Sequence, residues 1–322
     1  MIEIAGGGLA GLASALELAR CGAKVRIYEA GPEIGASSVA RFAGGMLAPW
    51  CERESAEEPV LVLGAQAADW WAEITPVTRR GTLVVAPPRD QAELTRFSKR
   101  TSGFRPVEGA EIDALEPALS GRFSKGLFFE QEAHLDPRRA LKDMAAAAEA
   151  LGVEIITGTK APDKVDLDCT GIDAALPELR PVRGEMAILH CPEITITRTL
   201  RLIHPRMPLY LVPRGDGVFM IGGTMIESSS ARAPTVRSLS EMLSAAFTLH
   251  PGFAEASVIE TGSGLRPAFP DNLPRLVSEG ETLHMNGLYR HGFLLAPAMA
   301  ARVAQHFFPE ATNEHHRERE IS

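Results

Sequence analysis

Three glycines and one acidic residue near the N-terminus have the types and the spacing of a dinucleotide site. Gly6, Gly8 and Gly11 form a G-x-G-x-x-G, and Glu29 follows after about twenty residues. Glycines at these places permit a tight turn, a close approach of the backbone to a pyrophosphate and close packing of a helix on a strand. A carboxylate at this distance accepts hydrogen bonds from an adenosine ribose. The pattern therefore predicts that this region binds a dinucleotide.

The elements that must position these residues are also present. An apolar strand is expected over residues 1–5, a helix from Leu9 to Cys21, and a second strand over residues 24–29 that ends on the acid. The helix N-terminus, at Leu9 and Ala10, offers free N–H groups and the positive end of the helix dipole to phosphates. The alternative is a glycine-rich loop in another kind of α/β protein. This unit alone does not distinguish a flavin from a nicotinamide.

A long loop of small residues follows, over residues 30–49. It contains Ala30, Ser37, Ser38 and the run Gly44-Gly45-Met46. Small side chains let the backbone approach a flat ligand. Ser37 and Ser38 are candidate phosphate contacts, with ordinary loop hydroxyls as the alternative. Met46 either contacts the ligand or fills a gap in the core, which is the commoner role of a methionine.

Composition excludes several classes of partner. The 322 residues carry a net charge of −8, with 45% hydrophobic and 23% charged residues, which gives no basic surface for nucleic acid. The four cysteines form no C-x-x-C pair and no metal-ligand spacing with histidine. We find neither a leader-like segment nor an apolar run of about eighteen residues, so we expect no membrane insertion and a cytoplasmic location. The tail, residues 315–322, is expected to be flexible, and the sequence leaves a homo-oligomer open.

The rest of the chain alternates helical and strand patterns. The main elements expected are helices over residues 59–74, 137–150 and 298–308, a buried strand over 164–171, and a hairpin over 209–224. Asp136 is the expected N-cap of the second of these helices. Pro213 within the hairpin indicates an edge strand or a bulge. Recurring strand–helix–strand units predict an α/β fold.

Four further motifs resemble those of a known family and together span nearly the whole chain. They are Gly44-Gly45-Met46-Leu47-Ala48-Pro49; Tyr210-Leu211-Val212-Pro213-Arg214 leading to Ile221-Gly222-Gly223-Thr224-Met225; Gly264-Leu265-Arg266-Pro267; and Gly287-Leu288-Tyr289-Arg290-His291-Gly292-Phe293-Leu294-Leu295-Ala296-Pro297. The last motif is the most specific. On these motifs the chain resembles the D-amino-acid-oxidase-like FAD-dependent oxidoreductases, and within them the glycine oxidases of thiamine biosynthesis.

The resemblance implies a substrate pocket that holds a carboxylate. Arg266 matches the arginine that binds the substrate carboxylate, and a guanidinium suits that task because its planar fork pairs both oxygens. Tyr210 matches a tyrosine that hydrogen-bonds the same carboxylate, Arg290 lies near flavin and substrate, and Met225 forms a pocket wall. From position alone, the two arginines are also compatible with exposed loop residues, and the tyrosine with a core or edge residue.

The resemblance also implies FAD as the cofactor. The loop over residues 287–292 presents backbone N–H groups to the pyrimidine edge of a flavin, and fixed dipoles there favour the reduced state. We do not expect His291 to act as a catalytic base, and we expect no metal site. The implied cofactor contacts are Gly6, Gly8, Leu9, Ala10, Gly11, Glu29, Ala30, Ser37, Ser38, Gly44, Gly45, Met46, Gly171, Gly264, Leu288, Tyr289, Arg290, His291, Gly292, Phe293 and Leu294.

The implied fold is α/β, with a Rossmann-like FAD-binding domain interleaved with a mixed-sheet α+β substrate domain. The FAD-binding domain is expected to take residues 1–76, 134–176 and 262–314. The substrate domain is expected to take residues 77–133 and 177–261.

The implied activity is oxidative deamination of glycine or a similar small amino acid or amine, with dioxygen as acceptor and hydrogen peroxide as product, in support of thiamine thiazole synthesis. The alternatives are a D-amino-acid dehydrogenase that passes electrons to a quinone, an NAD(P) enzyme of another class, and a non-catalytic flavin-binding module. Pro208 stands where the glycine oxidases carry a histidine, and the region over residues 152–171 is short. These departures bear on the substrate range more than on the cofactor.

Overall fold

The N-terminal pattern becomes part of a six-stranded sheet. The computed structural model describes residues 1–204 and 207–310. The strands lie in the order β16-β17-β9-β1-β2-β8, and neighbours are parallel except for the pair β16 and β17. Their bounds are β1 (Ile2–Ala5), β2 (Val25–Glu29), β8 (Glu154–Thr157), β9 (Leu167–Asp168), β16 (Arg275–Glu279) and β17 (Thr282–Asn286). This is the sheet of a Rossmann-like nucleotide-binding unit.

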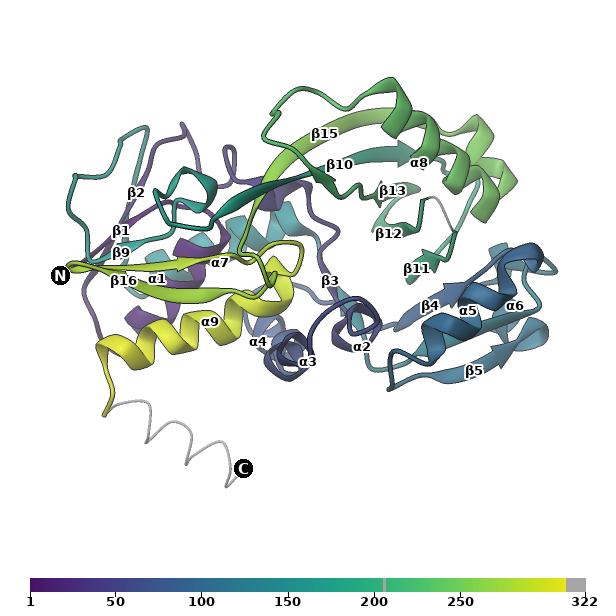
Figure 1. Ribbon diagram of the computed structural model, residues 1–322, viewed down its shortest axis with the longest axis horizontal. Helices are drawn as coiled ribbons and strands as arrows, with labels where there is room; N and C mark the ends of the chain where they lie inside the picture. The colour runs from purple at the N-terminus through teal and green to yellow at the C-terminus, as the bar shows by residue number, and fades with distance from the viewer. Residues whose placement is uncertain (205–206, 311–322) are drawn as a thin grey trace.

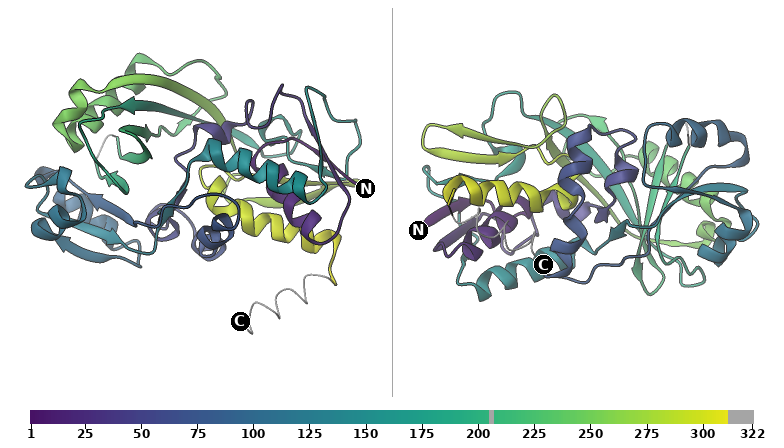
Figure 2. Two further views of the ribbon diagram at one scale, coloured as in Figure 1. Left: turned by 180° about the vertical axis from the view of Figure 1, so that it is seen from behind. Right: turned by 90° about the horizontal axis from the view of Figure 1, so that it is seen from below.

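Three helices pack beside this sheet: α1 (Leu9–Arg20), α7 (Pro137–Ala150) and α9 (Gly292–Phe307). Helix α1 contacts both of the others, and Figures 1 and 2 show the three lying together. The apolar residues that repeat at helical spacing in α1 are the ones that become buried, Leu9, Leu12 and Leu16 among them. Helix α1 is buried on nearly every side, because the sheet, α7 and α9 all pack against it.

The junction between β1 and α1 is as tight as the glycine pattern predicts. Gly6 has φ +96°, a left-handed conformation that glycine adopts without strain. A Cβ atom on Gly11 would lie 1.9 Å from the carbonyl oxygen of Gly6. Only a residue without a side chain fits there, so the helix can begin close to the end of the strand.

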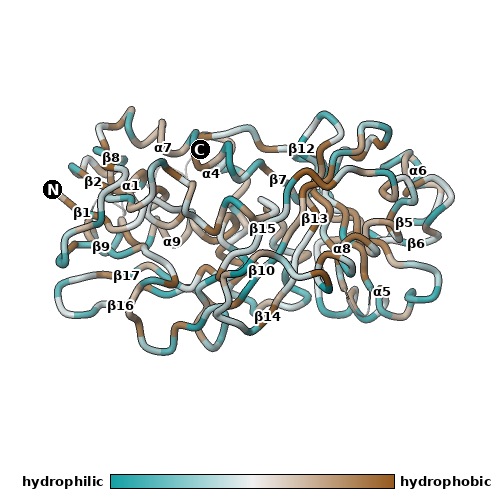
Figure 3. Tube along the Cα trace, turned by 90° about the horizontal axis from the view of Figure 1, so that it is seen from above, coloured by the Kyte–Doolittle hydropathy of each residue, from teal (hydrophilic) through white to brown (hydrophobic). Residues whose placement is uncertain are grey.

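The second sheet has nine strands and carries its own core. Its order is β14-β10-β13-β12-β11-β4-β6-β5, with β15 paired to β10; the pair β11 and β4 is parallel and the others are antiparallel. The bounds are β4 (Thr82–Val85), β5 (Arg105–Glu108), β6 (Lys125–Phe129), β10 (Arg180–His190), β11 (Thr199–Leu202), β12 (Leu209–Gly215), β13 (Val218–Gly222), β14 (Ile226–Glu227) and β15 (Ser257–Ala268). Hydrophobic residues concentrate in its middle, around β12 and β13 (Figure 3).

Helices α5 (Gln91–Ser98), α6 (Gly109–Leu115) and α8 (Val236–Leu249) accompany the larger sheet. The long strands β10 and β15 run from the larger sheet towards the smaller one (Figure 1). A short ladder of β3 (Met46–Leu47) with β7 (Ala133–His134) and the short helix α2 (Pro49–Glu52) lie between the sheets, whereas α3 (Glu58–Gly64) and α4 (Ala67–Ala72) pack against α9. Because β10, β15, β3 and α2 lie where the two sheets meet, their residues can line a site between the sheets.

Most of the expected elements are confirmed. The Rossmann-like unit, the hairpin and the mixed second sheet are present, so the α/β prediction is correct. Asp136 caps α7, because its carboxylate accepts hydrogen bonds from the N–H groups of Arg138 and Arg139. The register of β12 shifts next to Pro213, and this is a bulge in an interior strand rather than an edge.

Three expected boundaries are wrong. The single helix over 59–74 is two helices, α3 and α4, and the strand over 164–171 is reduced to β9. The last helix begins six residues earlier than predicted, and Pro297 lies inside it. A proline there removes the hydrogen bond to the carbonyl of Phe293. The indole N–H of Trp71 donates to that carbonyl instead, at 2.7 Å, so the helix continues through the proline.

The expected domain limits stay a prediction, and β15 crosses the one at residue 262. The tail over 315–322 lies outside the described residues. Within residues 1–204 and 207–310, no helix is long and apolar enough to cross a bilayer. The same residues hold no cluster of three metal-ligating side chains.

Candidate active site

A cavity of about 1080 Å³ lies between the two sheets and joins both sets of predicted residues. It extends from Gly6 at the end of β1 to Arg266 on β15. Of the residues predicted for cofactor or substrate, Gly11 alone does not line it. Those that do are Gly6, Gly8, Leu9, Ala10, Glu29, Ala30, Ser37, Ser38, Gly44, Gly45, Met46, Gly171, Tyr210, Met225, Gly264, Arg266, Leu288, Tyr289, Arg290, His291, Gly292, Phe293 and Leu294.

The nucleotide end of the cavity is built mainly from backbone. The first intrahelical hydrogen bond of α1 runs from the N–H of Leu12 to the carbonyl of Gly8, so the amides of residues 9–11 are left for a ligand. Ser38 lies beside this turn, with its Oγ 3.2 Å from where a Cβ atom on Gly8 would stand. Free amides at a helix N-terminus form an anion site, and this one fits a pyrophosphate.

Glu29 closes the nucleotide end and is firmly held. It is 5% exposed, and its carboxylate accepts hydrogen bonds from the N–H of Gly7 at 2.9 Å, the N–H of Gly31 at 2.6 Å and the hydroxyl of Ser37 at 2.7 Å. Ser37 therefore contacts the acid, whereas Ser38 lies by the phosphate turn. Both serines were candidate phosphate contacts from the sequence, and the structure gives them different neighbours.

The middle of the cavity pairs a small-residue loop with a second helix N-terminus. Arg214 donates hydrogen bonds to the carbonyls of Ala43, Gly44 and Leu135, which fixes the loop before Met46. In α9 the first intrahelical bond runs from Leu295 to His291, so the amides of residues 292–294 precede it. Two helix N-termini, small residues and the buried carboxylate of Glu29 in a single cavity fit the phosphates, the ring and the ribose of FAD.

Arg266 is a cation without an acidic partner. Its Nη1 donates to the carbonyl of Thr224 at 2.9 Å, and no carboxylate in the described part of the chain forms an ion pair with it. Burial, followed by the charge of Arg290, lowers the pKa of the Arg266 guanidinium to about 10. A desolvated cation in a cavity is stabilised by an anion, so this end of the cavity suits a carboxylate ligand.

The position of Arg266 is set by its neighbours on β10. Gly184 faces it, and a Cβ atom there would lie 2.1 Å from Nη2 of Arg266. The Thr224 hydroxyl accepts from the N–H of Glu185 at 2.9 Å, and Glu185 forms a fully buried ion pair with Arg183 at 2.6 Å. These contacts fix the position of Thr224, whose carbonyl accepts the hydrogen bond from Arg266.

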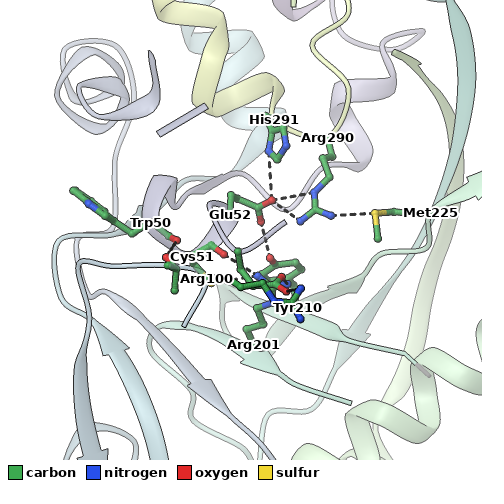
Figure 4. A network of polar contacts seen from close by, with 11 residues as sticks. Trp50, Cys51, Glu52, Arg100, Arg201, Tyr210, Met225, Arg290 and His291 are labelled. Carbon is green, nitrogen blue, oxygen red and sulfur yellow. Dashed lines mark hydrogen bonds and ion pairs between the residues drawn. The ribbon is translucent and has the colours of Figure 1, made fainter. Parts of the chain in front are cut away.

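Glu52, at the end of α2, was not predicted, yet it lies at the centre of the substrate end (Figure 4). Its carboxylate accepts hydrogen bonds from the hydroxyl of Tyr210 at 2.6 Å and from Nε and Nη2 of Arg290 at 3.0 and 2.5 Å. The Nδ1 of His291 lies 3.4 Å away. Burial raises the pKa of Glu52, but the neighbouring positive charges, that of Arg290 foremost, outweigh burial and lower the pKa to about 2, so Glu52 is ionised. The many charged residues from 52 to 58 have the composition of an exposed segment, so the sequence carried no signal for it.

The segment that carries Glu52 is anchored on both sides. The Glu132 carboxylate accepts from the N–H of Cys51 at 2.7 Å, and Arg201 donates to the carbonyl of Cys51 at 2.9 Å. The Arg201 guanidinium also stacks on the Tyr210 ring, 4.8 Å from its centroid. These contacts hold Glu52 and Tyr210 together.

Met225 and His291 complete the substrate end. The sulfur of Met225 lies 3.0 Å from Nη1 of Arg290, and its side chain is half exposed at the cavity. His291 is buried, and burial lowers its pKa to about 4, so its imidazole is neutral at pH 7. The structure thus brings all four predicted substrate residues, Arg266, Tyr210, Arg290 and Met225, into one cavity; their roles stay predictions.

Comparison with known proteins agrees with this geometry. A family model described as FAD dependent oxidoreductase matches residues 2–306. The chain is 55% identical over 317 residues, 96% of this chain and 97% of the relative, to a Rhizobium etli protein provisionally named the thiamine biosynthesis oxidoreductase ThiO. It is 26% identical, over 92% of this chain and 91% of the relative, to a glycine oxidase of Pseudomonas putida.

Some relatives are about twice as long as this chain. A bifunctional protein ThiO/ThiG of Trichormus variabilis is 29% identical over 94% of this chain but only 52% of its own length. Among solved structures, a glycine oxidase of Geobacillus kaustophilus superimposes with a TM-score of 0.80 at 22% identity, covering 94% of this chain and 93% of that one. That likeness supports the fold. The family match and the Rhizobium relative, each over nearly the whole chain, show that the protein belongs to the family of FAD dependent oxidoreductases.

Proposed function

We propose that this FAD-dependent enzyme oxidises glycine, or a similar small amino acid or amine, to the 2-oxo acid and ammonia or an amine. The proposed acceptor is dioxygen, which is reduced to hydrogen peroxide, and water hydrolyses the imine of the oxidised substrate to release the 2-oxo acid and ammonia or an amine. The observation that carries the proposal is Arg266, a desolvated guanidinium that faces the cavity without a carboxylate partner among the described residues. The names of the relatives, ThiO and glycine oxidase, support the same substrate class.

The residues of the cavity fit the cofactor that the family requires. Residues 9–11 and Ser38 would hold the pyrophosphate, Glu29 the ribose, and the loop over 44–46 with the start of α9 the flavin ring. When bound, FAD supplies a hydride acceptor that dioxygen can re-oxidise. The amides at the start of α9 would favour extra negative charge on the ring.

The chemistry at the substrate end rests on orientation. Arg266 would pair the substrate carboxylate and so fix the α-carbon and amine of a small substrate. Hydride leaves the α-carbon only when the substrate amine is neutral, so we expect the pocket to favour the deprotonated amine. Glu52 and His291, with pKa values of about 2 and 4, are weak bases at neutral pH, and burial raises the pKa of the Tyr210 hydroxyl. None of these groups is matched to general-base catalysis near pH 7.

The wider setting is also part of the proposal. The fusion of a ThiO part with a ThiG part in a relative supports a supply of product to thiamine thiazole synthesis. All four cysteines are unpaired, which supports a reducing, cytoplasmic compartment. A homo-oligomer is compatible with this proposal and is not required by it.

Anaerobic titration of the FAD-loaded protein tests the proposed function. Glycine, sarcosine and D-alanine should bleach the flavin absorption, whereas methylamine, which has no carboxylate, should bleach it far more slowly. Admission of air should restore the colour with uptake of dioxygen and release of hydrogen peroxide. Bleaching without dioxygen uptake would identify a dehydrogenase that uses another acceptor. If no amine bleaches the flavin, the protein is a non-catalytic flavin-binding module and the proposal fails.

A further inference from the structure

Glu52 occupies two groups that the sequence placed at the substrate: Tyr210, expected to bind the substrate carboxylate, and Arg290, expected near flavin and substrate. The hydroxyl of Tyr210 and the guanidinium of Arg290 both donate to its oxygens, at 2.5–3.0 Å. An arginine fork and a phenol that converge on one carboxylate form a complete anion site. That site is filled by a side chain of the protein itself.

The contacts of Glu52 are those of a fixed group. The Glu52 side chain is 10% exposed and that of Arg290 is 15% exposed, so their ion pair is shielded from water. The peptide before Glu52 is held from two directions, by Glu132 and by Arg201. Separating a buried ion pair leaves two uncompensated charges, so Glu52 does not yield its partners to a small ligand without cost.

Counting charges at the substrate end gives one free positive charge. Arg266 and Arg290 are cationic and Glu52 is anionic. Arg201 is paired with Glu54 at 3.2 Å, and the imidazole of His291 is neutral at pH 7. The cavity therefore offers charge compensation for one carboxylate, at Arg266. A second carboxylate on the same ligand would face Glu52.

We propose that Glu52 is a specificity-determining residue: it takes Tyr210 and Arg290 out of substrate binding, and its charge excludes ligands that carry two anionic groups. The substrate carboxylate then rests on Arg266, and Tyr210 acts through Glu52 as a positioning residue. This inference rests on the proposed function only for the identity of the substrate. The exclusion of dianions follows from the charges alone, because like charges brought together in a desolvated site strongly disfavour binding.

Inert acids test the inference without any turnover. Acetate carries one carboxylate and malonate two, and neither can be oxidised as an amine. Each acid is titrated into the FAD-loaded protein, and the change in flavin absorption gives its Kd. We expect wild type to bind acetate more tightly than malonate. Glu52→Gln, which keeps the shape and removes the charge, should shift the ratio of the two Kd values towards malonate by about tenfold or more.

Two further variants separate charge from structure. Glu54→Gln is the matched control, because Glu54 is also an acid at the cavity wall but pairs with Arg201 and Arg100 instead of Arg290. It should shift the ratio by no more than about threefold, because Glu54 contacts neither Tyr210 nor Arg290 and shares its charge between Arg201 and the exposed Arg100. Glu52→Asp retains the charge and should keep the wild-type preference for acetate, which gives a result even if the glutamine variant does not fold.

The outcomes distinguish this inference from the proposed function. If glycine fails to bleach wild type but the Kd ratio shifts in Glu52→Gln, the proposed function fails and the role of Glu52 stands. An unchanged ratio in Glu52→Gln overturns the inference. So does Tyr210→Phe if it weakens acetate binding tenfold, because the hydroxyl would then be a ligand of the substrate carboxylate. We expect Tyr210→Phe to leave the Kd of acetate within about threefold of wild type, since Arg266 holds the acid.

Discussion

The two ends of the cavity are built in different ways. At the nucleotide end, the groups predicted to bind the cofactor are mainly backbone amides from one short stretch, residues 6–11, together with the buried acid Glu29. At the substrate end, charged and polar side chains come from separate segments: α2, β12, β15 and the turn before α9. The nucleotide end requires glycine at positions where a side chain would clash. The substrate end requires side chains from separate segments to come together.

This contrast predicts how each end responds to change. A site built from backbone amides loses its shape when an added atom separates the strand from the helix. It then no longer binds any ligand that is held by its phosphates. A side-chain site fails for the ligand group that has lost its partner and leaves the rest of the protein intact. Substitutions at the two ends should therefore separate cofactor content from substrate kinetics.

The largest effect is expected for Gly11→Val at the nucleotide end. The Cβ position lies 1.9 Å from the carbonyl oxygen of Gly6, which is backbone and cannot move aside. Helix α1 must shift away from β1, and the amides of residues 9–11 shift with it. We expect the purified variant to contain no FAD. The measurement is the ratio of the flavin absorbance, at about 450 nm, to the protein absorbance, at about 280 nm. A variant with full FAD content would show that this junction does not control the phosphate site.

The next effect is expected for Arg266→Ala at the substrate end. Removal of one partner of a desolvated charge pair costs about 2–5 kcal/mol, so kcat/KM for glycine or sarcosine should fall by roughly 30-fold to several thousand-fold. FAD content should match wild type. Arg266→Lys should recover only part of the activity, because an ammonium cannot make the bidentate contact.

The control for Arg266→Ala is an amine without a carboxylate, measured in the same variant. Its oxidation, however slow, should be unaffected, because it has no group for the guanidinium to bind. If the variant slows both kinds of amine equally, Arg266 does not anchor the carboxylate.

The same contrast explains how much of the protein could be predicted from its sequence. The tight turn at the nucleotide end could be predicted from the sequence, because Gly6, Gly8 and Gly11 lie within six residues and each has a local steric task; the cofactor contacts there stay predictions. Arg266 and Arg290 were found only through motifs that resemble a family. Glu52 was missed because its role depends on Tyr210 and Arg290, which are 158 and 238 residues away in the chain. No local pattern marks a charge whose partners are that distant.

Helix ends show the same limit on a smaller scale. The start of α9 was misplaced because Pro297 is a reliable local stop signal, whereas the indole of Trp71, 222 residues away from Phe293, supplies the compensating hydrogen bond. Local rules predict what a residue does in isolation, and long-range contacts then decide whether the rule holds.

The smallest effect is expected for Gly184→Ala. At this position the absence of a side chain makes room for Arg266, so both kinds of dependence meet at one residue. Here an added methyl group acts on a side chain, because the Cβ position lies 2.1–2.5 Å from the guanidinium atoms of Arg266. The far end of an arginine can move, so the protein should fold and bind FAD normally while Arg266 leaves its place. We expect KM for glycine to rise about tenfold, since a shift of about 1 Å in a positioning group is costly. Gly109→Ala is the control, because its Cβ would meet no atom closer than 3.5 Å.

A double substitution decides whether Gly184→Ala acts through Arg266. If it does, adding Gly184→Ala to Arg266→Ala should change kcat/KM no further, because the group that it displaces is already absent. Two independent effects would multiply instead. Full multiplicativity, or a loss of FAD in Gly184→Ala alone, would mean that the methyl group disturbs the sheet between β10 and β15. The substrate end would then depend on backbone packing in the same way as the nucleotide end.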